Sequence, residues 1–383
     1  MFKTEIYRII SRKVFLTALF AALLVTVYYS FFALWDEGVI DGENVYLRED
    51  AVIRDKEIAA EFAGPLTEET VRAIWDKYGA PVNYGARGAT QERLMSLAGE
   101  GRYDNYCNRF VVRMFAEAVE TEDGEISFVL KENLSENPYL QGDYVFGYVG
   151  SGWIRYSSVD WFLVPLIMSS LVVIIALSPA FSEDYAYRTA DIILPAARGR
   201  MYLWWVRTGA DCLFATVCYW ILGMVFFGIQ MVYYGGTGLQ LRGVLVGLSR
   251  YWKTEDAPVW QLILQMYLAG WFSVIVLTFF VQAISARCRQ SFASLLCSLC
   301  AYIVPFGIMR FVLDRFLDLG QLSMQKIIMM LRMVVWSMPL SYCSMMMDAP
   351  SEWRWRMTVI VSAAAAAAFV FGMRGYCRHQ VES

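Results

Sequence analysis

Apolar and polar residues follow one another along this chain in long blocks. A first apolar run covers residues 14–35, a polar block covers residues 36–158, and a second apolar run covers residues 159–181. A helix needs about 20 apolar residues to cross the ~30 Å hydrocarbon core of a bilayer, so both runs are long enough. The pattern predicts two membrane-spanning helices, with residues 36–158, the polar insert, outside the bilayer.

Further apolar stretches continue the pattern towards the C-terminus. They predict spans at residues 208–234, 258–285, 291–312 and 353–373. The stretch 327–347 is also apolar, but Arg332 and Pro339 interrupt it, so it is a full span, a re-entrant hairpin or an interfacial helix. The chain therefore has six spans without this stretch, or seven with it.

Composition and charge agree with a membrane protein and orient it. Charged residues make up 18% of the chain, below the roughly 25% of soluble domains. The insert holds 23 acidic and 12 basic residues, a net charge of -11, and the rest holds 13 acidic and 21 basic residues, a net charge of +8. Because Lys and Arg near span ends stay in the cytoplasm, the insert is expected on the outer side of a bacterial cell membrane. We do not expect nucleic acid to be a partner.

Both chain ends are expected inside in the six-span arrangement, and the seven-span alternative places the C-terminus outside. Residues 1–13 carry apolar side chains on one helical face and four bases on the rest, which favours an interfacial helix or, alternatively, an extension of the first span. Residues 374–383, with Arg374 and Arg378, form a cytoplasmic tail in the six-span arrangement.

The insert has the features of a small, mainly helical α+β domain. Thr67 and Gly79 bracket one amphipathic helix as its N-cap and its C-terminal stop. Further helices are expected at residues 91–97 and 105–118, and a strand at 126–131. Cys107 is the only cysteine of the insert, so a disulfide framework within it is excluded.

Catalytic and metal-binding motifs are missing from the sequence. No stretch supplies the Gly-x-x-x-x-Gly-Lys-Ser/Thr loop of nucleotide-binding proteins, and His379 in the tail is the single histidine. The acidic run 120–125 does not have the ligand spacing of an EF-hand. We therefore expect a chain that is not an enzyme and holds neither a metal nor a cofactor itself.

Charged residues inside apolar segments are costly and are candidates for function. Asp211, Arg310 and Arg332 are such residues. Each has a structural alternative: Asp211 forms a hydrogen bond near the interface, Arg310 pairs with Asp314 at helical spacing, and Arg332 extends its charge to the interface.

The connection 182–207 carries the most specific local pattern. Apolar residues 192–194 are flanked by charged ones, which suits either docking to a cytoplasmic protein or a loop on the membrane. The motif comprises Phe181, Glu183, Asp184, Tyr185, Arg188, Thr189, Leu194, Pro195 and Arg198. It resembles the Phe-x-x-Glu-Tyr-x-x-Gly-Thr, Leu-x-x-Pro and Arg pattern of ABC-2 type ABC transporter permeases. It departs from this pattern where Asp184 replaces Glu, where Arg188 replaces Gly, and where Leu194 directly precedes Pro195.

The resemblance implies a permease subunit with a large extracytoplasmic domain between its first two spans. It implies a partner ATPase subunit that carries ATP and Mg, a second permease subunit in a homo- or heterodimer, and a re-entrant or interfacial segment at 321–347. The ATPase-coupling residues that it implies are Glu183, Asp184, Tyr185, Arg188, Thr189, Ile193, Leu194 and Arg198. We expect export of a peptide, lipid or drug-like molecule; the alternative is a membrane-anchored sensor whose insert binds a ligand.

Overall fold

The computed structural model is mostly helical and divides into two compact units. The first unit comprises Met1–Val27, Phe162–Phe226 and Gln265–Ser383, and the second comprises Tyr28–Trp161 and Phe227–Leu264. The structure describes residues 1–35, 37–84, 90–120, 126–150, 153, 159–187, 200–246, 256–308, 338–340, 342 and 351–378.

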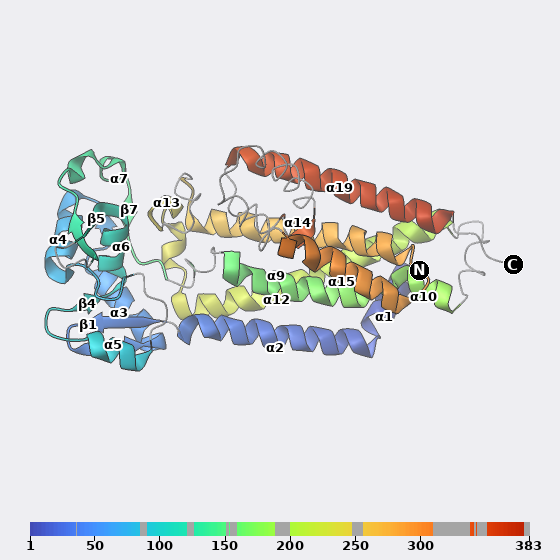
Figure 1. Ribbon diagram of the computed structural model, residues 1–383, viewed down its shortest axis with the longest axis horizontal. Coiled ribbons are helices and arrows are strands. Elements are labelled where there is room, and N and C mark those ends of the chain that lie inside the picture. The colour runs from blue at the N-terminus through green and yellow to red at the C-terminus, as the bar shows by residue number, and fades with distance from the viewer. Residues whose placement is uncertain are drawn as a thin grey trace. The chain divides into compact units, whose positions relative to one another are not determined.

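Five stretches among the described residues are helical, long and apolar enough to cross a membrane (Figure 1). They are Lys13–Phe32, Phe162–Ala186, Arg200–Tyr234, Val259–Ser285 and Arg354–Cys377. The helices that contain them are α2 (Lys13–Trp35), α9 (Val159–Leu177) with α10 (Pro179–Ala186), α12 (Arg200–Tyr234), α14 (Val259–Ser285) and α19 (Ser351–Cys377). A helix satisfies its own backbone hydrogen bonds, which is what lipid surroundings require. These features are those of a polytopic helical membrane protein.

The expected spans at 14–35, 159–181, 208–234, 258–285 and 353–373 each overlap one of these helices. The stretch expected at 291–312 begins as α15 (Ser291–Ile308), whose apolar part is shorter than the other five. The alternatives for 327–347, and the segment at 321–347, fall almost entirely outside the described residues. The N-terminal residues form a separate helix, α1 (Phe2–Ile10).

In its described residues, the insert forms a mixed domain of short helices and three small antiparallel sheets. Its helices are α3 (Arg48–Ala60), α4 (Glu68–Tyr78), α5 (Gln91–Leu97), α6 (Tyr106–Phe115), η1 (Leu134–Glu136) and α7 (Pro138–Gln141). Its strands are β1 (Gly38–Asp41), β2 (Asn44–Leu47), β3 (Gly64–Pro65), β4 (Tyr103–Asp104), β5 (Ala116–Glu120), β6 (Ile126–Leu130) and β7 (Val145–Phe146). The sheets have the orders β2-β1-β4, β3-β7 and β5-β6.

The local signals of the insert decide where its helices begin and end. The Thr67 side chain accepts a hydrogen bond from the Thr70 amide at the start of α4, and Gly79 ends this helix with a φ of +60°. The structure confirms the helices expected at 68–78 and 91–97, which are α4 and α5, and the strand expected at 126–131, which is β6.

The expected helix at 105–118 is wrong at its C-terminal end. Helix α6 stops at Phe115, and Ala116 begins β5, which pairs with β6 from Ala116↔Leu130 to Glu120↔Ile126. The pairing with β6 supplies the hydrogen-bond partners that the backbone of residues 116–120 would otherwise find within a helix. This strand pairing therefore overrides the helical pattern of the sequence.

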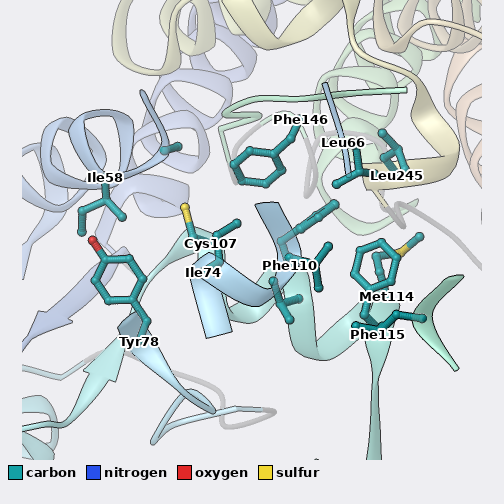
Figure 2. Packing of buried hydrophobic residues seen from close by; sticks show 14 of the residues in the cluster. Ile58, Leu66, Ile74, Tyr78, Cys107, Phe110, Met114, Phe115, Phe146 and Leu245 are labelled. Atoms are coloured by element: carbon teal, nitrogen blue, oxygen red, sulfur yellow. The ribbon is translucent and has the colours of Figure 1, made fainter. Parts of the chain in front are cut away.

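One apolar core holds the insert together (Figure 2). Helices α4 and α6 face each other across it with Ile74 and Phe110, and Phe146 of β7 packs on the same cluster. Leu245 of α13 (Gly243–Val246), far along the chain, is only 3% exposed in this core. Leu245, which lies in the segment between α12 and α14, therefore contributes to the core of the insert.

Two further contacts fix this segment, which also contains η2 (Thr237–Gln240). The Arg113 guanidinium donates a 3.1 Å hydrogen bond to the Leu245 carbonyl. Gly238 lies so close that a Cβ at this position would be 2.3 Å from the Tyr148 carbonyl oxygen. No side chain fits there without movement of the backbone.

Candidate functional site at one end of the spanning helices

The motif from the sequence lies where the second span ends. Glu183, Asp184 and Tyr185 are on α10, which follows α9 after Ser178 and begins with a proline, a residue favoured in the first helical turn. The remaining coupling candidates lie outside the described residues: Arg188, Thr189, Ile193, Leu194 and Arg198.

The N-terminal segment, which is α1 and the residues directly after it, places two arginines against α9 and α10. The Arg12 guanidinium pairs with the Glu183 carboxylate and donates a 3.0 Å hydrogen bond to the Ala176 carbonyl. Arg8, one helical turn earlier, donates to the Ala180 carbonyl at 2.9 Å and lies 3.7 Å from the Asp184 carboxylate. Arg8 lies in the last turn of α1 and Arg12 follows the end of this helix, so the N-terminal segment contacts both α9 and α10.

Helix α12 contributes the most deeply buried charge of the site. Arg207 pairs with Asp184 and lies 3.3 Å from Glu5 of α1, and these three side chains are 3%, 8% and 13% exposed. Its guanidinium also donates to the Ala180 carbonyl at 3.1 Å and lies 5.2 Å from the centre of the Phe181 ring. The carboxylates of Asp184 and Glu5 and the Ala180 carbonyl compensate part of the cost of burying this charge.

We call these six side chains the charge cluster: Glu5, Arg8, Arg12, Glu183, Asp184 and Arg207. Three carboxylates face three guanidinium groups, so the cluster is neutral overall. Burial and the nearby Arg207 lower the pKa of Arg8 from its ordinary value, while Glu5 and Asp184 act in the opposite direction. Arginine has such a high ordinary pKa that Arg8 keeps its charge.

Serine and tyrosine side chains tie α10 to the end of α14 and to the residue directly after it. The Ser285 hydroxyl accepts hydrogen bonds from the amides of Phe181 and Ser182 and donates to the Ser178 carbonyl at 2.7 Å. The Tyr185 hydroxyl donates to the Ala286 carbonyl at 3.2 Å. The start of α10 is therefore fixed by hydrogen bonds as well as by charge.

An aromatic layer lies beneath the charge cluster. The Phe181 ring stacks on Trp204 of α12, with the two ring centres 4.8 Å apart. Tyr376 of α19 packs on the Phe181 ring as well, and these two ring centres are 4.9 Å apart. All three side chains are at most 1% exposed. Segments α1, α10, α12, α14 and α19 thus meet at one place (Figure 1).

Asp211 is in a separate polar contact within the spanning helices. The Gln282 amide donates a 2.6 Å hydrogen bond to the Asp211 carboxylate, and Thr208 donates to Gln282 at 3.3 Å. This arrangement agrees with the structural alternative for Asp211, which joins α12 to α14. Arg310 and Arg332 lie outside the described residues.

Four of the six side chains of the charge cluster were not expected at this site. Arg8 and Arg12 counted only among the bases of residues 1–13, Glu5 was not singled out, and Arg207 counted only as one base of a polar connection. The available signal was the position of Arg207 beside an aromatic pair, Trp204 and Trp205, where a charge needs a partner.

The contacts described above join α10 to the helices around it. Within the described residues, no group of three or more His, Cys, Asp or Glu side chains could hold a metal ion. Comparison of the chain with protein-family models, curated proteins and solved structures finds no match.

Proposed function

We propose that this chain is the permease subunit of an ATP-driven transporter of the ABC-2 type, coupled to a separate ATPase subunit. The observation that carries the proposal is the anchoring of α10 by α1, α12, α14 and α19. The resemblance places the ATPase contact on 183–200, which begins in α10. A displacement of that segment by the ATPase would reach all of these helices at once.

The distribution of basic residues supports a cytoplasmic position for this end. Besides the arginines of the charge cluster, the same end carries the link after α14 and the last turn of α19, since Ala286 contacts Tyr185 and Tyr376 contacts Phe181. Arg287, Arg289, Arg374 and Arg378 lie in or beside these segments. Bases are retained in the cytoplasm, so both α1 and the end of α19 would face the ATPase, and α2 would lead to an external insert.

Residues of α10 and the residue after it would have different roles in coupling to the ATPase. Asp184 is buried and bonded to arginines of its own chain, so it holds α10 in place. Tyr187, directly after α10, is 73% exposed and free to meet a partner surface. We therefore expect the ATPase to contact Tyr187 and the residues that follow it, and Asp184 to act only as a positioning residue.

A permease of this kind works as a dimer with itself or a related chain, and export of a peptide, lipid or drug-like molecule is the expected activity. The test is purification of the tagged full-length chain from its native membrane with any ATPase subunit it retains. We expect a partner with a P-loop whose ATP hydrolysis changes when the permease is present. Absence of such a partner under conditions that keep the chain folded would overturn the proposal.

Tyr187→Ala is the variant that locates the contact. It should weaken ATPase retention while leaving the thermal stability of the permease unchanged, because the side chain packs on little of its own chain. Tyr84→Ala, which removes a 39% exposed tyrosine of the insert, is the matched control and should retain the ATPase. Equal retention by both variants would exclude Tyr187 from the contact.

Ligand binding by the insert without any ATPase would instead favour a sensor. This test needs the full-length chain, because a fragment of residues 36–158 would lack Leu245 and the carbonyl to which Arg113 donates. Failure of an isolated fragment to bind ligand would therefore say nothing about the sensor alternative.

A further inference from the structure

Helices α14, α15 and α19 line an open groove of about 660 Å³ within the first unit. Its floor consists of small side chains of α19, Ala364, Ala367 and Ala368, and its walls include Phe280 of α14 and Phe371 of α19. The volume is in the range of ~300–1,000 Å³ typical of ligand sites. Since α14 and α19 are candidate membrane spans, this apolar groove would face lipid chains in a bilayer.

The mouth of the groove carries a positive charge. Arg287, in the link between α14 and α15, is exposed and lies over the Phe371 ring, 3.7 Å from its centre. One of its nitrogens is 3.4 Å from the Phe371 carbonyl. Among the residues that the structure describes, no carboxylate pairs with Arg287, so its remaining donors can bind an anion.

The position of Arg287 along the spans decides which anion reaches it. Arg287 follows Ala286, which contacts α10 beside the charge cluster, so the mouth lies at the basic end of the spanning helices. Basic residues at span ends mark the cytoplasmic side, where anionic lipids attract them. The groove therefore opens at the level of lipid headgroups.

We propose that this groove binds an anionic phospholipid, with its phosphate on Arg287 and an acyl chain along the alanines of α19. Basic pockets between spanning helices on the cytoplasmic side are suited to such headgroups. The alanine floor leaves room for the chain, and Phe280 and Phe371 shield it from the side. The inference rests on the membrane embedding of the chain and is independent of transport or an ATPase.

The test compares two lipids that share acyl chains but differ in headgroup charge. The purified full-length chain in detergent is incubated with phosphatidylglycerol or phosphatidylcholine, and bound lipid is counted by native mass spectrometry. We expect preferential retention of phosphatidylglycerol. Arg287→Gln should reduce that retention about fivefold, which corresponds to roughly 1 kcal/mol for one basic residue at the headgroup level.

Two other variants distinguish the contribution of the acyl chain to lipid retention from that of the headgroup. Ala368→Phe fills the groove and should reduce retention of both lipids, while Arg356→Gln, which removes an arginine beside Trp355 near the other end of α19, should retain phosphatidylglycerol as the unchanged protein does. Equal retention of the two lipids, or undiminished phosphatidylglycerol on Arg287→Gln, would overturn the proposal. Unchanged retention on Ala368→Phe would place the lipid elsewhere.

Discussion

Replacement of Arg207 by Met is the sharpest test of the charge cluster. The change removes the guanidinium and keeps an unbranched side chain of similar length. It leaves Asp184 and Glu5, which are 8% and 13% exposed, without their buried partner. It also removes the hydrogen bond to the Ala180 carbonyl.

The loss of unfolding free energy in Arg207→Met depends on the partners that Asp184 and Glu5 keep. Loss of one partner of a buried ion pair costs about 3–5 kcal/mol. Arg8 still lies 3.2 Å from Glu5 and 3.7 Å from Asp184, so we expect the lower end, about 3 kcal/mol. Arg12→Gln breaks a pair whose side chains are 19% and 30% exposed, and we expect a loss of no more than about 1 kcal/mol there.

The assay is unfolding of the full-length chain in mixed micelles, followed by tryptophan fluorescence as the fraction of denaturing detergent increases. Arg72→Gln, which breaks the exposed Arg72–Glu68 pair of α4, serves as the control and should be nearly neutral. The order of loss should be Arg207→Met, then Arg12→Gln, then Arg72→Gln.

A double variant distinguishes the loss of the ion pair from a general loss of packing. Asp184→Leu together with Arg207→Met removes both charges, so it leaves no unpaired carboxylate at this position and should be more stable than Arg207→Met alone. If Arg207→Met costs no more than the control, or if the double variant is the less stable of the two, the cluster is not held by buried ion pairs.

The other predictions concern the insert. Burial raises the pKa of the Asp55 carboxyl group to about 7, and the nearby Arg109 opposes this shift. The folded state therefore binds the carboxyl proton more tightly than the unfolded state does. The stability that this proton contributes is lost as pH rises from about 4 through 7, by at most about 1.4 kcal/mol per pH unit. Thermal melts across this range should show that Asp55→Asn reduces the downward slope, and an unchanged slope would contradict the assignment. Gly238→Ala should cost about 1–3 kcal/mol in the unfolding assay because its Cβ meets backbone, whereas Gly228→Ala, with nothing within 4 Å, should not destabilise the chain. Burial raises the pKa of the Cys107 thiol, so peptide mapping should find it unlabelled by maleimide until the insert unfolds.

Local features of the chain were readable from its sequence. The apolar runs gave the spanning helices, because lipid surroundings leave a helix as the only way to satisfy such a backbone. The capping residue Thr67 and the stop at Gly79 gave the bounds of α4, because both act within one turn. Residues 116–118 were misread as helix because their strand partner, rather than their own pattern, decides their conformation.

Contacts between distant segments could not be read in the same way. Arg12 and Glu183 are 171 positions apart, and no period in the sequence records which of many bases and acids meet across such a distance. Leu245 lies in the connection between two expected spans, and nothing in its sequence surroundings indicates that it belongs to the core of the insert. The pattern established that each charge or apolar side chain needed a partner, and only the fold determines the partner.

The charge cluster has a physical reason to be ionic rather than apolar. Arg8 and Arg207 both donate to the carbonyl of Ala180, and Arg12 donates to that of Ala176, so three side chains from other segments hold the backbone where α9 gives way to α10. Apolar side chains could fill the same volume but could not donate to these carbonyls. Irregular backbone near lipid is tolerated where other groups satisfy it. The arginines therefore fix the direction in which α10 leaves the second span, and with it the point from which the following segment reaches any partner.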